Sequence, residues 1–492
     1  MANYIIGLDF GTYQTKVCVN HLDSNPQQHE FFQFQKDKDD SFFFPSKVVY
    51  LNNHTFKYGN YIGDDVREIY NYFKIASAED ERFQLVSNIK RPVYNYGGSF
   101  GEFSPEFLSV IFITNILLLV KQHFNSNKGG GFSLSRGLFG RLRGTQEVIN
   151  TFSIRLGIPT EYSKQINLLR RRKFETILLI SEILQKGFKY SIETFHSYTK
   201  DELISLISSI LKELHQSDTN IDFLMNDTYR ISVYPESAAG LLYFAKSGKL
   251  DTGIYAAIDI GGGTSDISFF NVQPDKKIMY LASESFLNAC NNIYIDYMGG
   301  SSIELNQISQ TEAKLIELIQ NQDWENDVKY VKAVKGVKLS IESRLKFLFN
   351  NAVFGQLAYI NPTSIRKACQ GKPCLIYGGG ILHPWISGWD GIMVYDGGIQ
   401  ASLCSNSYTY MDTKNVNAYI PDYSIIKNKK WDKYFSLLIV AFGLSYLHHK
   451  DHNYWDDHDY KSIKIKEILE EVPHPRNEGM YIYNVLERRW NV

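Results

Sequence analysis

Two glycine-rich turns in this chain each follow an aspartate. One covers residues 9–13 (DFGTY) near the N-terminus, and the other covers residues 259–264 (DIGGGT) near the middle. Glycine lets backbone N–H groups approach anionic oxygens closely because it has no Cβ in the way. Thr12 and Thr264 add hydroxyl donors. Two such turns placed face to face could hold the phosphates of one nucleotide from both sides.

The two aspartates, Asp9 and Asp259, stand where their carboxylates would face those phosphates. Bare carboxylates repel a polyphosphate, so a cation must lie between them. Mg²⁺ fits because it prefers oxygen ligands and keeps several of its waters, and both aspartates would then hold it mainly through water. A single Asp-x-Gly would be interpreted as a turn that caps its own hairpin, but two matched copies favour a phosphate site.

Apolar segments on either side of each turn predict the strands that position it. Residues 3–20 are expected to form a strand, a turn and a second strand. The turn at 259–264 is also flanked by apolar segments, which predict a strand on each side. Further strands are expected at 47–51, 151–159, 230–233 and 373–377. Helices are expected from Ser104 to Phe124 and over 164–186, 237–245, 327–348 and 433–448, with another that begins at the capping box Thr199–Glu202.

The bulk composition narrows the class of protein. The chain has 492 residues, 44% of them hydrophobic, and a formal net charge of −1. This predicts large cores in more than one domain and gives no global basic field for nucleic acid. Five scattered cysteines and an N-terminus without a signal-peptide pattern favour a reducing, cytoplasmic location. The apolar run 107–120 is shorter than the roughly 20 residues of a membrane span, so a buried helix is expected.

In their order along the chain, the motifs resemble the actin-like ATPase superfamily, and within it the nucleotide-binding domain of DnaK-type heat-shock chaperones. IGLDFGT and AIDIGGGTSDIS are similar to the two phosphate motifs, and VYPESAAGLL to the connecting helix. LIYGGGILHPWI resembles the adenosine motif. FSPEFLSVIF, RLGIPTEY and VAFGLSYL are closer to the chaperones than to actin. The resemblance implies an α/β, two-lobed actin-like ATPase (duplicated ribonuclease-H-like) fold with four subdomains.

The resemblance also implies a set of ligands and contact residues. The cofactors would be ATP or ADP with Mg²⁺, the metal being held by Asp9 and Asp259. The expected nucleotide contacts are Asp9, Gly11, Thr12, Tyr13, Lys16, Gly261, Gly262, Gly263, Thr264, Gly299, Gly300, Gly378, Gly379 and Gly380. Lys16 stands where actin-type members place a phosphate-contacting lysine.

Three residues are candidates for the catalytic roles: Asp259, Glu236 and Lys74. Lys74 is the candidate for the catalytic lysine of the chaperones, and a surface lysine on a helix is the alternative. The family's water-orienting glutamate precedes a proline, but here Tyr234 precedes Pro235 and Glu236 follows it. Either Glu236 takes the role with a shifted turn or Asp259 positions the water alone. Loss of such a group commonly slows catalysis by about 10² to 10⁴, so any ATP hydrolysis is expected to be slow.

Three regions follow from the order of the motifs. Residues 1–250 would form lobe I, with an inserted helical upper subdomain and a basic, glycine-rich loop at 125–145. Residues 251–448 would form lobe II, ending in a helix that closes back onto lobe I. Residues 449–492 are a tail too short for the chaperones' peptide-binding domain. Its histidines and aspartates match no strong metal motif, so a partner-facing tail is favoured.

The first functional hypothesis is a DnaK-like, ATP-hydrolysing switch whose lobe closure controls binding of a protein partner. The alternative is an actin-like filament-forming ATPase of the segregation or cytoskeletal type. A small-molecule kinase comes third because no substrate pocket or catalytic aspartate for it can be named. A protein partner is expected, a homo-oligomer stays open, and neither a membrane nor directly bound nucleic acid is expected. The fold alone does not choose among these functions.

Overall fold

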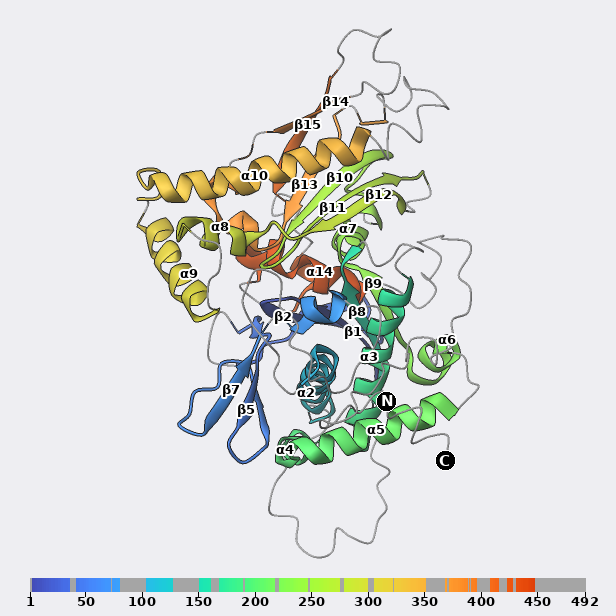
Figure 1. The fold of residues 1–492 in the computed structure, drawn as a ribbon. Coiled ribbons are helices and arrows are strands. Elements are labelled where there is room, and N and C mark those ends of the chain that lie inside the picture. The colour runs from blue at the N-terminus through green and yellow to red at the C-terminus, as the bar shows by residue number, and fades with distance from the viewer. Residues whose placement is uncertain are drawn as a thin grey trace, which may run out of the picture.

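The protein forms two lobes that lie one above the other in Figure 1. The computed structural model describes residues 2–35, 41–71, 73–79, 103–126, 150–160, 168–188, 191–216, 221–246, 248–274, 278–299, 305–321, 323–350, 368–369, 371–387, 389, 391–395, 408–415, 423–427 and 431–446. The basic loop expected at 125–145 falls almost entirely outside these residues, and the tail 449–492 does so completely.

The elements within these residues have the following bounds. The strands are β1 (Asn3–Phe10), β2 (Gln14–His21), β3 (Gln28–Phe31), β4 (Phe44–Pro45), β5 (Val48–Leu51), β6 (Phe56–Tyr58), β7 (Val66–Tyr70), β8 (Thr151–Ile158), β9 (Ile231–Pro235), β10 (Gly253–Ile260), β11 (Ser265–Val272), β12 (Ile278–Phe286), β13 (Cys374–Tyr377), β14 (Gly391–Tyr395) and β15 (Tyr408–Asn415). The α-helices are α1 (Phe73–Glu79), α2 (Pro105–Ser126), α3 (Leu168–Gly187), α4 (Ile192–Ser197), α5 (Lys200–Gln216), α6 (Ile221–Phe223), α7 (Glu236–Lys246), α8 (Cys290–Tyr297), α9 (Leu305–Gln320), α10 (Val328–Leu348), α13 (Pro384–Ser387) and α14 (Phe435–Tyr446). Shorter 3₁₀ or π turns are η4 (Leu224–Tyr229), η6 (Gly379–Leu382), η8 (Tyr423–Ile425) and η9 (Asp432–Tyr434).

Each lobe is built on a sheet with the same arrangement of strands. The first has the order β3-β2-β1-β8-β9, with β4 beside β2, and the second has the order β12-β11-β10-β13-β15-β14. In both sheets, three antiparallel strands are followed by two parallel ones: β8 and β9 run parallel to β1, and β13 and β15 run parallel to β10. The second sheet ends in β14, which is antiparallel to β15. This repeat confirms the duplicated ribonuclease-H-like, two-lobed actin-like fold that the sequence predicted.

The central strands are buried along almost their whole length. In β1 every residue after Asn3 is buried, and in β10 only Asp259 is partly exposed. Such continuous burial is expected where helices cover both faces of a sheet. Because their side chains are enclosed on both faces, these strands are rigid supports for whatever follows them.

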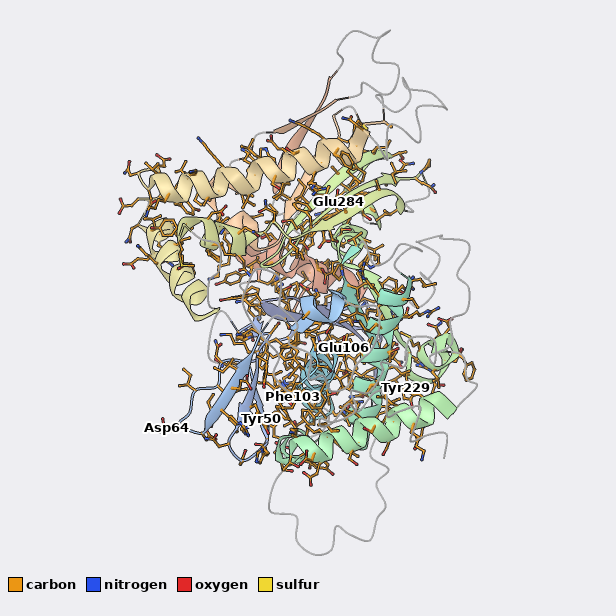
Figure 2. All side chains as sticks on the ribbon, viewed as in Figure 1. Tyr50, Asp64, Phe103, Glu106, Tyr229 and Glu284 are labelled. Atoms are coloured by element: carbon orange, nitrogen blue, oxygen red, sulfur yellow. The ribbon has the colours of Figure 1, made fainter. Side chains whose placement is uncertain are left out.

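Helix α2 runs through the interior of lobe I. Ser104 caps its first turn by accepting a hydrogen bond from the N–H of Phe107 at 3.0 Å, and Pro105 takes the first helical position. By length and composition it is apolar enough to cross a membrane, but 83% of its most apolar window is buried inside the protein. Figure 2 shows Phe103 and Glu106 at the start of this helix within the lobe. The expected buried helix is therefore confirmed.

Two helices cross between the lobes. Helix α7 follows the last strand of the first sheet but packs against the second, where a Cβ on Gly240 would lie 3.2 Å from the Tyr377 ring. Helix α14 comes from lobe II but packs against β1, where a Cβ on Gly7 would meet the Ala441 carbonyl oxygen at 2.3 Å. The two helices touch backbone to backbone, because a Cβ on Gly443 would lie 1.7 Å from the Ala239 oxygen. Their crossing joins the two lobes at one place.

Candidate functional site

The first turn, between β1 and β2, is fixed from behind by Ser46. The Ser46 hydroxyl donates to the Gly11 carbonyl at 2.7 Å, and its N–H donates to the Tyr13 carbonyl at 3.0 Å. Asp9 and Lys16 are directly opposite each other in the hairpin, and their carboxylate and ammonium groups are 3.0 Å apart. The hairpin therefore presents an aspartate and a lysine at the base of its glycine turn.

The second turn, between β10 and β11, is fixed in the same way by the start of α8. The N–H groups of Cys290 and Asn291 donate to the carbonyls of Gly261 and Gly262 at 3.1 and 2.9 Å. These are N–H groups of a helix N-terminus, which have no partner within their own helix. In each lobe, then, carbonyl groups of the glycine turn are bonded to the protein behind the turn.

The two turns meet. A Cβ added to Gly262 would lie 3.3 Å from the Cβ of Tyr13, so the tips of the hairpins are in contact across the lobes. Beside them lies a cavity of about 840 Å³, within the range of ligand sites. The sequence-predicted residues that line it are Asp9, Gly11, Thr12, Tyr13, Lys16, Lys74, Glu236, Asp259, Gly261, Gly262, Thr264, Gly378 and Gly379.

Lys74 and Glu236 form a buried ion pair in the wall of this cavity. The Lys74 Nζ lies 2.6 Å from the Glu236 Oε1, although the two residues are 162 positions apart in the sequence. Lys74 comes from α1, and Glu236 is the first residue of α7. Burial alone would lower the pKa of Lys74, but Glu236 and Asp9 together raise it, so the lysine is held in its charged form.

The cavity gathers more negative than positive charge. Asp9, Glu236, Asp259 and Asp266 all line it. Burial and the charges of Asp266, Glu236 and Asp9 raise the pKa of Asp259 well above its ordinary value. Burial, with help from Asp9 and against the effect of Lys74, also raises the pKa of Glu236. Asp259 and Glu236 therefore hold their protons more tightly than ordinary carboxyl groups do, first because they are buried and second because other carboxylates lie near them.

This excess of carboxylates suits a divalent cation. Among the described residues no three His, Cys, Asp or Glu side chains are close enough to hold a metal ion directly. A Mg²⁺ ion would therefore take its other ligands from phosphate oxygens and water, with Asp9 and Asp259 nearest to it. The carboxylates present therefore suit a Mg²⁺ ion that they contact through its bound water molecules.

A third glycine turn completes the cavity on the lobe II side. It follows β13, and Gly378 has a positive φ of 84°. A Cβ there would lie 2.2 Å from the Asp259 Oδ1, so the aspartate rests directly on the Gly378 backbone. The N–H of Gly378 donates to the Ser436 carbonyl in α14 at 3.1 Å. The turn thus links Asp259 to the helix that joins the lobes.

Three predicted contact residues within the described part of the chain do not line the cavity. Gly263 and Gly380 are buried behind their turns, and Gly299 is exposed at the end of α8. Gly300 lies outside the described residues, so its contact stays a prediction. Gly299 therefore contributes no wall of the cavity.

The sequence interpretation missed Asp266, a buried residue directly opposite Asp259 in the β10–β11 hairpin. It accepts a hydrogen bond from the Ser285 hydroxyl. Its position seven residues after Asp259 was the available signal, because an antiparallel hairpin with a four-residue turn brings those two residues opposite each other. Cys290 and Tyr294 of α8 also line the cavity.

Comparison with known proteins adds little to this geometry. No model of a protein family matches the chain, and no curated protein matches it. Among solved structures it is similar to a 15-stranded ParM filament from Clostridium botulinum, with 16% sequence identity and a TM-score of 0.33. The match covers 77% of this chain and 90% of that chain. The two chains share too little sequence and spatial arrangement for this likeness to bear on function.

Proposed function

We propose that the protein binds ATP with Mg²⁺ in the cavity between its lobes and hydrolyses it slowly to ADP and phosphate. The observation that carries the proposal is the contact between the two glycine turns, with Asp9 and Asp259 on either side of one cavity. Backbone N–H groups of both turns, with Thr12 and Thr264, would bind the phosphates. Bound Mg²⁺ would neutralise phosphate charge and relieve the repulsion among the carboxylates.

Hydrolysis needs an oriented water and stabilised charge on the transferred phosphoryl group. We assign the water to Glu236, whose Oε1 is held by Lys74 while its Oε2 can accept a proton or orient the attacking water. Lys74 and Lys16 would stabilise the developing negative charge. Glu236 follows Pro235 and is the first residue of α7, two positions after Tyr234, which stands where the family has its water-orienting glutamate. We propose that Glu236 takes that role from its shifted position.

The test separates binding from turnover. The wild type should bind ATP in a magnesium-dependent way, and Glu236→Gln should keep binding while single-turnover hydrolysis falls by about 10² to 10⁴. Glu213→Gln, on the exposed part of α5, is the matched control and should behave as the wild type does. Normal hydrolysis by Glu236→Gln would remove Glu236 from the mechanism. Failure of the wild type to bind ATP would refute the proposed function altogether.

Two finer functions use the same ATP site: a DnaK-like switch for a protein partner and a filament-forming ATPase. The second is favoured here by one observation. Large apolar side chains are exposed on α10, at Val328, Leu339 and Phe347, and on β7 of the small sheet, at Ile69. Such side chains are typical of protein contacts when they share a surface. Sedimentation with and without ATP distinguishes the two, because only the filament function predicts large particles of the pure protein.

A further inference from the structure

A buried histidine lies where three separate segments of the chain meet. His29 belongs to β3 in lobe I, and only 1% of its surface is exposed. Its backbone pairs with Ile426, and its carbonyl accepts from the N–H of Lys427 at 2.9 Å, in the segment that precedes α14. Its side chain packs on α14 itself. We call this contact of β3 with residues 426–427 and α14 the α14 joint.

The imidazole of His29 is bonded to α14 through one nitrogen. Its ring centroid lies 4.9 Å from that of Phe442 and 5.6 Å from that of Tyr446. The Nδ1 is 2.8 Å from the Ser445 Oγ, and that hydroxyl donates to the Phe442 carbonyl at 2.7 Å. Because a hydroxyl has one proton to donate, the imidazole is the donor to Ser445. The neutral ring therefore carries its proton on Nδ1.

The joint provides no acceptor for a second proton on this ring. Within the described part of the chain, the Nε2 of His29 makes no hydrogen bond. The carboxylate of the next residue, Glu30, is 3.2 Å from the Nε2 of His21 and 3.9 Å from the Lys427 ammonium. That carboxylate is therefore already paired, and the groups paired with it are basic.

The other titratable side chains around the ring add no negative charge near neutral pH. Cys18 of β2 shares the Ser445 hydroxyl, and burial raises the pKa of its thiol to about 12. Tyr446 of α14 packs on the ring, and Tyr243 of α7 packs on Tyr446 and Phe442. A thiol and two phenols are uncharged at this pH. A protonated His29 would therefore be a buried and uncompensated cation.

Protonation of His29 is thus unfavourable while the joint is closed. Burial, and secondly the nearby His21, lower the pKa of His29 from 6.5 to about 3. A histidine whose pKa is lowered on folding stabilises the fold above its unfolded pKa, and this contribution is lost as pH falls from 6.5 towards 3. Between pH 7 and pH 5, the equilibrium constant for any opening that exposes the ring should rise about 25-fold.

We propose that His29 makes the α14 joint an acid-sensitive connection between the lobes, which opens when its imidazole takes up a second proton. In the open joint, α14 has separated from β3. This helix also supports the cavity, because its Ser436 carbonyl accepts from Gly378, against whose backbone Asp259 rests. The open joint therefore does not hold ATP, and bound ATP favours the closed joint. This coupling to ATP rests on the function proposed above.

Hydrogen exchange of the α14 amides tests the joint without nucleotide. After correction for intrinsic exchange rates, protection of residues 435–446 in the wild type should fall between pH 7 and pH 5. In His29→Gln and His29→Phe the fall should be about 25-fold smaller, because neither new side chain titrates. Phenylalanine replaces one flat ring by another, so it serves as the second variant if the glutamine variant fails to fold.

The matched control is His54→Asn, which removes an exposed histidine between β5 and β6. Asparagine tolerates the positive φ of 64° at this position. This variant should show the same pH dependence of α14 protection as the wild type. The carboxyl groups of the cavity are present in every variant, so their titration cancels in the comparison. The same pH dependence in the wild type and in both His29 variants would overturn the proposal.

The coupling to ATP is measured by the same exchange experiment at pH 5. With ATP and Mg²⁺ at a hundred times the Kd, α14 protection in the wild type should rise by up to about 100-fold. If ATP binds and α14 protection does not rise, the coupling between the joint and the cavity is wrong. If the wild type binds no ATP even at pH 7, the proposed function is refuted, and the exchange without nucleotide decides on the joint.

Discussion

The negative charge of the cavity is concentrated around Asp259. It lies among Asp9, Glu236 and Asp266, and Gly378 packs against its carboxylate. A carboxyl whose pKa is raised in the folded state favours folding at low pH, and that contribution is lost as pH rises from the unfolded pKa of about 3.9 through the raised value. The nucleotide-free protein should therefore lose stability over that window.

We predict opposite effects of Asp259→Asn on stability and on ligand binding. Without ligand, the variant should be more stable by roughly 1 kcal/mol near pH 7, because one incompletely neutralised carboxylate is gone. Its stabilisation by ATP and Mg²⁺ should fall sharply. Thermal unfolding with and without ligand measures both. The wild type should also release protons when Mg²⁺ and ATP bind, which calorimetry in buffers of different ionisation enthalpy detects. If Asp259→Asn without ligand were less stable than the wild type without ligand, this account would be contradicted.

A second prediction separates backbone strain from damage to the site. Gly378 and Gly371 both have positive φ, 84° and 68°, but only Gly378 has Asp259 against its Cα. Gly371→Ala should cost about 1 kcal/mol through strain alone and leave ATP binding unchanged. Gly378→Ala should cost more and displace Asp259, so that ATP binding is lost as well. Denaturant unfolding and ATP titration of both variants test this, and equal binding by the two would contradict it.

At the scale of elements, local sequence patterns predicted most of the structure that positions the site. The β1 and β10 hairpins, the capped start of α2 and the helices α7, α10 and α14 all carry their signals in neighbouring residues. Helix α8 does not. Its N-cap position is Ala289, whose side chain offers no hydrogen bond, and its first N–H groups are satisfied by Gly261 and Gly262. The Asn292 side chain accepts a hydrogen bond from the N–H of Ala289 at 3.0 Å, but the glycine turn that binds the start of the helix is a tertiary contact, which a sequence pattern does not reveal.

The pairing of Lys74 with Glu236 shows the same limit. Each was a candidate for its own reason, but no local pattern joins residues 162 positions apart. Their contact requires α1 and the start of α7 to reach one cavity, which depends on how lobe I folds as a whole. The sequence could therefore name the two residues and could not place them together.

The crossing of α7 and α14 leads to a prediction about two helical glycines. Gly443 lies where the helices touch, and Gly336 lies on the exposed side of α10 with its nearest neighbour at 3.8 Å. Gly443→Ala should destabilise the protein by about 3 kcal/mol or more, because its Cβ would collide with the Ala239 backbone. Gly336→Ala should stabilise by roughly 0.5–1 kcal/mol. The measurement is the free energy of unfolding in denaturant. If both substitutions changed it in the same direction, the close crossing of α7 and α14 would be refuted.

At the scale of the molecule, the cavity has walls from both lobes, so ATP binding should draw them together. Asn60 in lobe I and Leu382 in lobe II both line it and are both exposed. We predict that spin labels at Asn60→Cys and Leu382→Cys move several ångströms closer when ATP and Mg²⁺ are added. Four native cysteines, Cys18, Cys290, Cys369 and Cys374, are buried. The fifth cysteine, Cys404, is replaced by serine in the labelled protein so that it does not take up a spin label.

The control pair is Asn53→Cys with Asn60→Cys, both within the small sheet region of lobe I. Its distance should not change with nucleotide. If the interlobe distance also stays constant while ATP binds, the lobes are already closed, and nucleotide would not act as a switch.

The packing of α14 on β1 has a consequence for biosynthesis. One face of the first sheet to leave the ribosome is covered by residues 435–446, which are among the last described in the chain. At 5–20 residues per second, translation leaves that face uncovered for about 20 to 90 seconds. Until then the nascent chain exposes the apolar side of its own N-terminal strands to the surrounding solution. The N-terminal lobe is therefore expected to complete its folding only after residues 435–446 have left the ribosome, and chains truncated before residue 435 should aggregate.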